Sequence, residues 1–89
     1  MKYLNWNHEK NEILKTKRGI SFEEVALLIE SGHILGIKEN QSRPNQKIYI
    51  LEINNYAFIV PFVEKDNEVF LKMAFPSRKY AKVYDLKGE

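Results

Sequence analysis

A capping box at residues 21–24, read Ser-Phe-Glu-Glu, divides the first third of the chain into two short helices. The Ser21 hydroxyl is expected to accept a hydrogen bond from the Glu24 amide, while the Glu24 carboxylate returns to the Ser21 amide. Asn7 is the expected N-cap of the preceding helix, and Gly19 supplies the left-handed residue that ends it. Gly32 ends the second helix. The sequence therefore predicts two helices joined by a tight turn.

From Ile34 onward the apolar residues recur with a period of two and are largely β-branched or aromatic, which is typical of strands. Strands are expected at 33–37, 47–53, 56–63 and 69–75, with a loop at 39–46, a turn at 64–67 and a helix at 77–85. Asn54-Asn55 can adopt the positive φ values of a two-residue hairpin turn. Pro61 has no amide to donate, so its part of the strand is expected at a sheet edge or at a bulge.

The predicted fold is a single α+β domain over residues 1–89, with two N-terminal helices, an antiparallel sheet of three to four strands and a C-terminal helix. The helices are expected to cover one face of the sheet. The other face remains partly open, and its apolar remainder would suit a partner.

Composition excludes several classes of function. The chain contains no cysteine, which excludes disulfides, thiolate metal sites and a cysteine nucleophile. His8 and His33 lack metal-ligand spacing, and no glycine-rich phosphate loop or common hydrolase motif is present. No apolar stretch has the length of a signal peptide or a membrane span. We expect a soluble cytoplasmic protein that uses no metal and no cofactor.

Positive charge is concentrated near the C-terminus, although the formal net charge is only +2. Residues 72–87 carry five basic side chains and one acidic one, namely Lys72, Arg78, Lys79, Lys82, Lys87 and Asp85. Arginine presents a planar fork to phosphate, lysine adds a point charge, and a tyrosine such as Tyr80 or Tyr84 can stack on a base. A ribonuclease that works without a metal needs those groups. Equally, basic residues on a C-terminal helix favour its dipole and keep a small domain soluble.

A second group of cations lies in the first helix and includes Lys10, Lys17 and Arg18. Positive charge near a helix C-terminus is favourable whatever the function. On physical grounds alone, these side chains are therefore expected to be ordinary surface residues. Trp6 is expected to anchor the helix entrance. Arg43, on a loop before Pro44, is a candidate substrate clamp or a plainly exposed side chain.

Segments 6–10 (WNHEK) and 17–24 (KRGISFEE) resemble the opening of the BrnT family of bacterial toxins, and Arg78-Lys79 resembles that family's closing motif. The matching positions are Trp6, Lys10, Lys17, Gly19, Ser21, Phe22 and Arg78. The chain has Asn7-His8 where the family usually has Asp-Pro, Arg18 where it commonly has His, and Phe75-Pro76-Ser77-Arg78 where it has Ile-Ser-Ala-Arg. Met73, beside Lys72, replaces an arginine often seen there.

The resemblance implies a RelE-like ribonuclease fold. It also implies a type II toxin that cleaves RNA without a metal, with mRNA as one candidate substrate, and thereby inhibits translation. It also implies a hetero-oligomer with an antitoxin, a DNA-binding protein encoded by an adjacent gene. Among the candidate catalytic residues, Arg78 would stabilise the phosphate, and Lys17 or Arg18 would reach it from the helix turn. Lys79 would add to the positive electrostatic field. Tyr80 would stack or relay a proton, and His8 is the candidate general base. The candidate RNA-binding residues are Lys10, Arg43, Lys72, Lys82 and Tyr84.

This hypothesis requires the cations of the helix turn and Arg78 to converge on one phosphate. The alternative is a non-catalytic module that uses the same basic surface to bind RNA or an acidic protein segment. A third reading is a structural domain whose charges serve only solubility.

Overall fold

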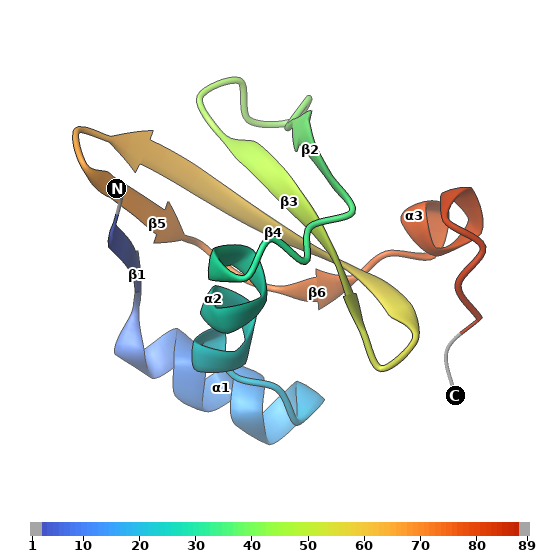
Figure 1. Cartoon of the computed structure of the whole chain (residues 1–89). Helices are drawn as coiled ribbons and strands as arrows, with labels where there is room; N and C mark the ends of the chain where they lie inside the picture. Colours follow the sequence, from blue (N-terminus) through green and yellow to red (C-terminus); the bar gives the residue numbers. More distant parts are fainter. Residues whose placement is uncertain (1–2, 88–89) are drawn as a thin grey trace.

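The computed structural model describes residues 3–87, which form three helices and a six-stranded mixed sheet. The elements are β1 (Tyr3–Trp6), α1 (His8–Arg18), α2 (Phe22–Glu30), β2 (Gly36–Glu39), β3 (Lys47–Ile53), β4 (Tyr56–Lys65), β5 (Glu68–Leu71), β6 (Phe75–Pro76) and α3 (Arg78–Val83). The strand order is β1-β5-β4-β3-β2, and β6 pairs with β4 beyond the end of β5. Figure 1 shows α1 and α2 on one side of the long β3–β4 pair, with α3 at the far end of the molecule from β1.

The two N-terminal helices begin and end as their capping residues predict. Asn7 Oδ1 accepts a hydrogen bond from the Lys10 amide at 3.0 Å, and Gly19 takes φ of +69° at the end of α1. Ser21 Oγ accepts a hydrogen bond from the Glu24 amide at 3.2 Å. The return half of the box differs from the expected one, because the Glu24 carboxylate accepts a hydrogen bond from the Ser21 hydroxyl instead of the Ser21 amide.

A buried asparagine joins α1 to α2. Asn11 is only 1% exposed, and its Oδ1 accepts a hydrogen bond from the Phe22 amide at 2.8 Å. Its Nδ2 donates to Glu23 Oε1, also at 2.8 Å. The Phe22 amide is one of the first amides of α2, which have no partner within the helix. Asn11 therefore caps the second helix from within the first and joins the two helices.

The β3–β4 hairpin is the longest pairing in the sheet and has the predicted turn. Asn54 and Asn55 take φ of +55° and +62°, and the turn is closed by the Ile53–Tyr56 pair. Positive φ at both central positions is the geometry that matches the right-handed twist of the strands. The hairpin prediction is confirmed.

The sheet is larger than predicted and is mixed instead of antiparallel. β1 was not expected, and it runs parallel to β5 with Leu4 opposite Val69 and Trp6 opposite Leu71. Because a parallel partner so distant in sequence leaves no local turn signal, a four-residue strand of this kind cannot be recognised from periodicity. The second strand begins at Gly36, three residues later than predicted.

The predicted strand at 69–75 is broken by a bulge opposite Pro61. Phe62 pairs with Leu71 and Ile59 pairs with Phe75, so two residues of β4 face three residues between β5 and β6. The Lys72 amide donates to the Pro61 carbonyl at 2.7 Å, and Pro61 has no amide to return the bond. Pro61 thus lies in a central strand, at a bulge as one branch of the prediction stated.

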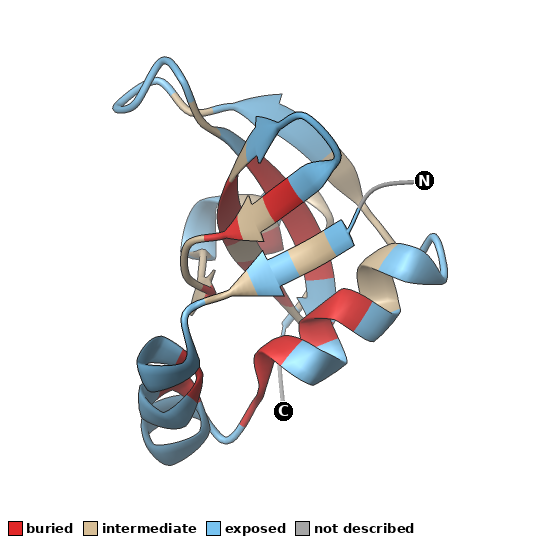
Figure 2. Ribbon diagram, turned by 90° about the vertical axis from the view of Figure 1, so that its left-hand side faces the viewer, coloured by how far each residue is buried: buried red, intermediate tan, exposed pale blue. Residues whose placement is uncertain are grey.

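Helices cover both sheet faces, which corrects the expectation that they cover only one. The α1–α2 face carries the main core, in which Leu14, Phe22 and Val25 pack against inward residues of β3, β4 and β5. The opposite face carries a smaller cluster in which Ala81 of α3 packs on Ile50 and Ala57. Figure 2 shows buried residues concentrated in the strands and on the sheet-facing side of α2. Since α3 has only six residues, it leaves part of its face open.

We predict that Asn11→Ala lowers the free energy of unfolding by about 1–3 kcal/mol, because it leaves a buried backbone amide without an acceptor. Chemical denaturation of the variant and the wild type measures this difference. The matched control is Asn45→Ala, at an exposed loop asparagine, which should change stability by less than about 0.5 kcal/mol. Equal stability of the Asn11 variant and the wild type would show that the bridge is dispensable.

We also predict that Glu23 makes stability dependent on acid pH. The Asn11 hydrogen bond is the main cause that holds the pKa of Glu23 below its usual value of 4.5, followed by a backbone amide. A lowered folded-state pKa gives stabilisation that is fully present above the unfolded pKa and is lost as the pH falls through the folded value. Wild type should therefore exceed Glu23→Gln in stability at pH 7, and the gap should close in thermal melts below pH 4.5. A gap that is constant with pH would contradict the assignment.

Candidate functional site

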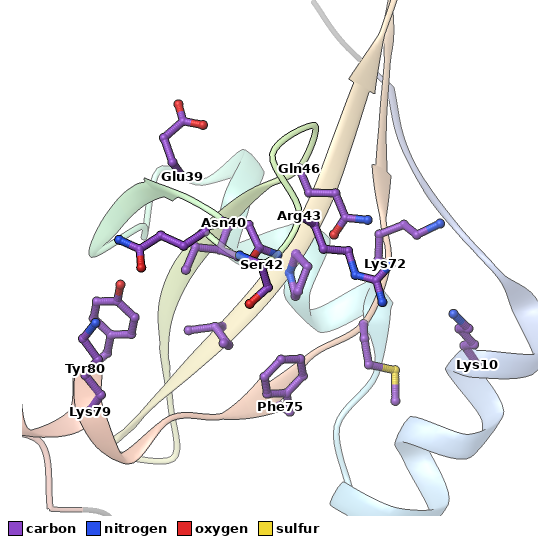
Figure 3. Close-up of a pocket in the computed structure, with 15 residues that line it drawn as sticks. Lys10, Glu39, Asn40, Ser42, Arg43, Gln46, Lys72, Phe75, Lys79 and Tyr80 are labelled. Atoms are coloured by element: carbon purple, nitrogen blue, oxygen red, sulfur yellow. The ribbon is translucent and has the colours of Figure 1, made fainter.

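A cleft of about 790 Å³ lies over the part of the sheet that α3 leaves open. Its residues are Lys10, Glu39, Asn40, Gln41, Ser42, Arg43, Gln46, Ile48, Ile59, Pro61, Lys72, Met73, Phe75, Lys79 and Tyr80. One wall is the loop between β2 and β3, and another is the start of α3 (Figure 3). The cleft therefore gathers segments from five separate parts of the chain.

The floor of the cleft is apolar and is set by strand register. Ile48 is opposite Pro61, and Ile59 is opposite Phe75. Directly opposed residues of antiparallel strands share a face, so these four side chains point to the same side of the sheet. This is also the face on which α3 packs, because Ile50 and Ile59 are opposite each other.

Four cationic side chains surround this floor, against one carboxylate, that of Glu39. Lys10 comes from the first turn of α1, Arg43 from the β2–β3 loop, Lys72 from the bulge and Lys79 from α3. None of them forms an ion pair with a carboxylate within residues 3–87. An excess of like charges without ion-pair partners creates a positive potential that favours binding of an anion.

Two of the cations also lie near aromatic rings. Lys72 Nζ is 5.3 Å from the centroid of Phe70, and Lys79 Nζ is 5.3 Å from the centroid of Tyr80. At this distance the ring quadrupole attracts the ammonium group. These contacts restrain the two lysines without neutralising their charge.

The loop that carries Arg43 is closed by its own hydrogen bonds. The Asn40 amide donates to the Gln46 carbonyl at 3.2 Å, and the Gln46 amide donates to the Arg43 carbonyl at 2.9 Å. The Arg43 amide donates to the Asn40 carbonyl at 3.1 Å, and Asn40 Oδ1 accepts from the Ser42 amide at 3.1 Å. Figure 3 shows the Arg43 side chain entering the cleft beside Lys72. The loop therefore forms one wall of the cleft in a conformation fixed by its own hydrogen bonds.

Five of the eleven candidate residues line the cleft: Lys10, Arg43, Lys72, Lys79 and Tyr80. The other six do not: His8, Lys17, Arg18, Arg78, Lys82 and Tyr84. Lys17 and Arg18 end α1, about two helical turns beyond Lys10, and Figure 1 separates that end of α1 from α3. The cations that the structure brings together in the cleft are therefore not those of the helix turn and Arg78.

Sequence reasoning did not select Gln41, Ser42, Gln46 and Phe75, which also line the cleft. The run Asn40-Gln41-Ser42-Arg43 contains no apolar residue, and that polarity is the signal that could have marked it. Phe75 could not be selected, because its direction depends on the bulge.

Tyr84 has a structural position. Its hydroxyl donates a hydrogen bond to the Leu35 carbonyl at 3.3 Å, and its ring packs on the cluster under α3. A Cβ placed on Gly36 would lie 2.8 Å from that hydroxyl. Tyr84 therefore ties the end of α3 to the start of β2, and the missing side chain at Gly36 makes room for it.

Other regions offer weaker candidates. A second hollow of about 470 Å³ lies between the end of α2 and the β3–β4 turn, and no lysine or arginine lines it. Within residues 3–87 no group of three or more histidine, aspartate or glutamate side chains could hold a metal ion. None of the helices in that range is both long and apolar enough to cross a bilayer. The pKa of Tyr49 is raised by burial, with the charge of Glu64 as second cause, but Tyr49 lies in the core, stacked on Phe62.

We predict that Gly36→Ala and Tyr84→Phe are coupled. Gly36→Ala should displace the Tyr84 hydroxyl and lower the free energy of unfolding by about 1 kcal/mol through loss of its hydrogen bond. In a Tyr84→Phe background the same change should cost less, because no hydroxyl remains to be displaced. Denaturation of the two single variants and the double variant gives the coupling energy. Strictly additive effects would show that the two residues do not interact.

Comparison of the chain with protein-family models, with curated proteins and with solved structures gave no match. The residues of the cleft and their arrangement are therefore the basis on which a function is assigned.

Proposed function

We propose that this protein is a metal-independent endoribonuclease of the bacterial toxin type and that RNA binds in the cleft. The observation that carries the proposal is the meeting of Lys10, Arg43, Lys72 and Lys79 over one apolar floor, without a carboxylate partner for any of them within the described chain. Backbone phosphates are the ligand that such a group of cations suits best. The resemblance of segments 6–10 and 17–24 to the BrnT opening supports the toxin class, and with it a cytoplasmic location and a neutralising antitoxin as partner.

The reaction that fits these groups is an internal transfer at phosphorus. The ribose 2′-oxygen forms a bond to phosphorus and loses its proton, the bond to the 5′-oxygen breaks, and that oxygen gains a proton. The products are a 2′,3′-cyclic phosphate and a 5′-hydroxyl. Negative charge grows on the non-bridging oxygens, where Arg43 and Lys72 would bind them, and preplaced donors there act most strongly in the transition state.

Lys10 and Lys79 stand at the borders of the cleft and would bind neighbouring phosphates (Figure 3). Lys17, Arg18, Arg78 and Lys82 are exposed outside it and would add to the field along a longer RNA. His8 remains a candidate base by residue type, because a neutral imidazole nitrogen can accept a proton. It is two residues from Lys10 on α1, however, so their side chains point about 160° apart around the helix.

A non-catalytic module that binds RNA or an acidic protein segment is the second candidate. One observation favours it: the one carboxylate of the cleft, that of Glu39, points away from Arg43 and Lys72 in Figure 3. A cleft with cations but no aligned proton acceptor can bind a phosphate without cleaving beside it.

We predict that the protein cleaves total RNA in the presence of a chelator and leaves cyclic phosphate ends. Arg43→Ala and Lys72→Ala should each lower the cleavage rate by roughly a hundredfold or more, the usual effect of removing one transition-state donor. Each should also reduce the salt dependence of RNA binding by about one phosphate contact. The matched control is Lys65→Ala, an exposed lysine outside the cleft, which should leave the rate within a few fold.

Three outcomes would change the assignment. Intact RNA with tight, salt-dependent binding would replace the enzyme by the binding module. Loss of activity in Arg78→Ala with full activity in Arg43→Ala would move the scissile phosphate out of the cleft to the start of α3. Neither cleavage nor binding would refute both candidates.

A further inference from the structure

The cleft has two chemically different ends. Figure 3 places Tyr80 and Lys79 at one end and Lys72 and Lys10 at the other, with Phe75 between them. The end at Lys72 also receives the Arg43 guanidinium, so two cations are adjacent there. The end at Tyr80 offers an aromatic ring, the polar loop and one cation, Lys79. A ligand that carries both charge and a flat ring would therefore bind in one direction.

The Tyr80 ring is held in place but remains partly exposed. The side chain packs on the cluster of Ile50, Ala57 and Ala81, and the backbone amide donates to Ser77 Oγ at 3.3 Å. Its hydroxyl makes no hydrogen bond with a residue between 3 and 87. The Lys79 ammonium lies 5.3 Å from the centroid of this ring. An unpaired base that stacks on the ring would take the place of that ammonium.

The loop wall offers donors and acceptors that the fold does not use. Asn40 Oδ1 holds the loop by accepting from the Ser42 amide. The side chains of Gln41 and Ser42, in contrast, make no hydrogen bond within residues 3–87, although both line the cleft. Figure 3 shows the Ser42 hydroxyl directed into it. Since the loop is fixed by three backbone hydrogen bonds, these groups are presented with little cost in loop entropy.

We infer that the α3 end of the cleft is a base-recognition subsite, in which an unpaired RNA base stacks on Tyr80 and its edge is read by Gln41 and Ser42. This inference rests on the proposed function, that is, on RNA as the ligand of the cleft. Single-stranded RNA is then the substrate, because a paired base has neither a free face nor a free edge. Tyr80 acts as a stacking platform.

Binding of short RNAs tests the subsite apart from cleavage. The probes are fluorescent hexamers in a uridine background that differ in one central base and carry 2′-O-methyl groups, which block the attacking oxygen. Wild type should prefer one base by about tenfold or more, and Tyr80→Leu should weaken binding of the preferred hexamer by about tenfold. Tyr80→Phe should bind the preferred hexamer as wild type does, since it retains the ring. Leucine preserves an apolar contact with the α3 cluster, and thermal melts confirm folding.

Gln41→Ala and Ser42→Ala should reduce the preference between bases and leave the salt dependence of binding unchanged, because they contact no phosphate. The controls are Asn45→Ala in the same loop and Tyr3→Ala at an exposed tyrosine of β1, neither of which lines the cleft. Equal affinity for all four hexamers, or binding by Tyr80→Phe as weak as that by Tyr80→Leu, would overturn the subsite while RNA cleavage by the wild type still supports the proposed function. Base preference without any cleavage would support the subsite and refute the nuclease.

Discussion

The absent amide of Pro61 is the constraint on which the open face of the sheet depends. β5 pairs with β4 up to Leu71, and the next antiparallel pair would need a hydrogen bond that proline cannot donate. The chain therefore adds one residue before β6 resumes the pairing at Phe75. In a strand, a shift by one residue reverses which face each side chain occupies. Without the bulge Phe75 would point into the core; with it, Phe75 joins Lys72 in the cleft.

The two faces of the sheet differ in how fully they are covered. The helix pair covers the first face with large buried side chains, so that most of the apolar area removed from water lies there. The second face is covered only by the short α3, and it keeps Ile48, Ile59 and Pro61 beside open space. Substitutions in this apolar floor and its cationic border would have little effect on the main core. Such a division is expected where a small domain must both fold and bind a charged ligand.

The parts of the fold that the sequence predicted are those governed by neighbours along the chain. The capping residues and the Asn54-Asn55 turn act over two to four residues, and all of them are where expected. β1 was missed because its pairing with β5 is parallel and distant, and the split between β5 and β6 was missed because its cause is on another strand. The cleft could not be predicted from neighbours along the chain either. Lys10 and Lys79 were recognised as cations, but no spacing along the sequence could show that they share a site while Lys17 and Arg78 lie outside it.

Four like charges around one cleft carry an energetic cost that the fold itself does not offset. Repulsion between partly exposed cations is screened by water and salt, so the cost per pair is small, about 1 kcal/mol or less. The elements that hold them are nevertheless restrained, Arg43 by a hydrogen-bonded loop and Lys10 by a helix that Asn11 joins to α2. The cations are thus kept near one another instead of spreading apart to relieve the repulsion. A ligand whose phosphates neutralise them removes that cost on binding, so part of the affinity derives from how the unoccupied protein is built.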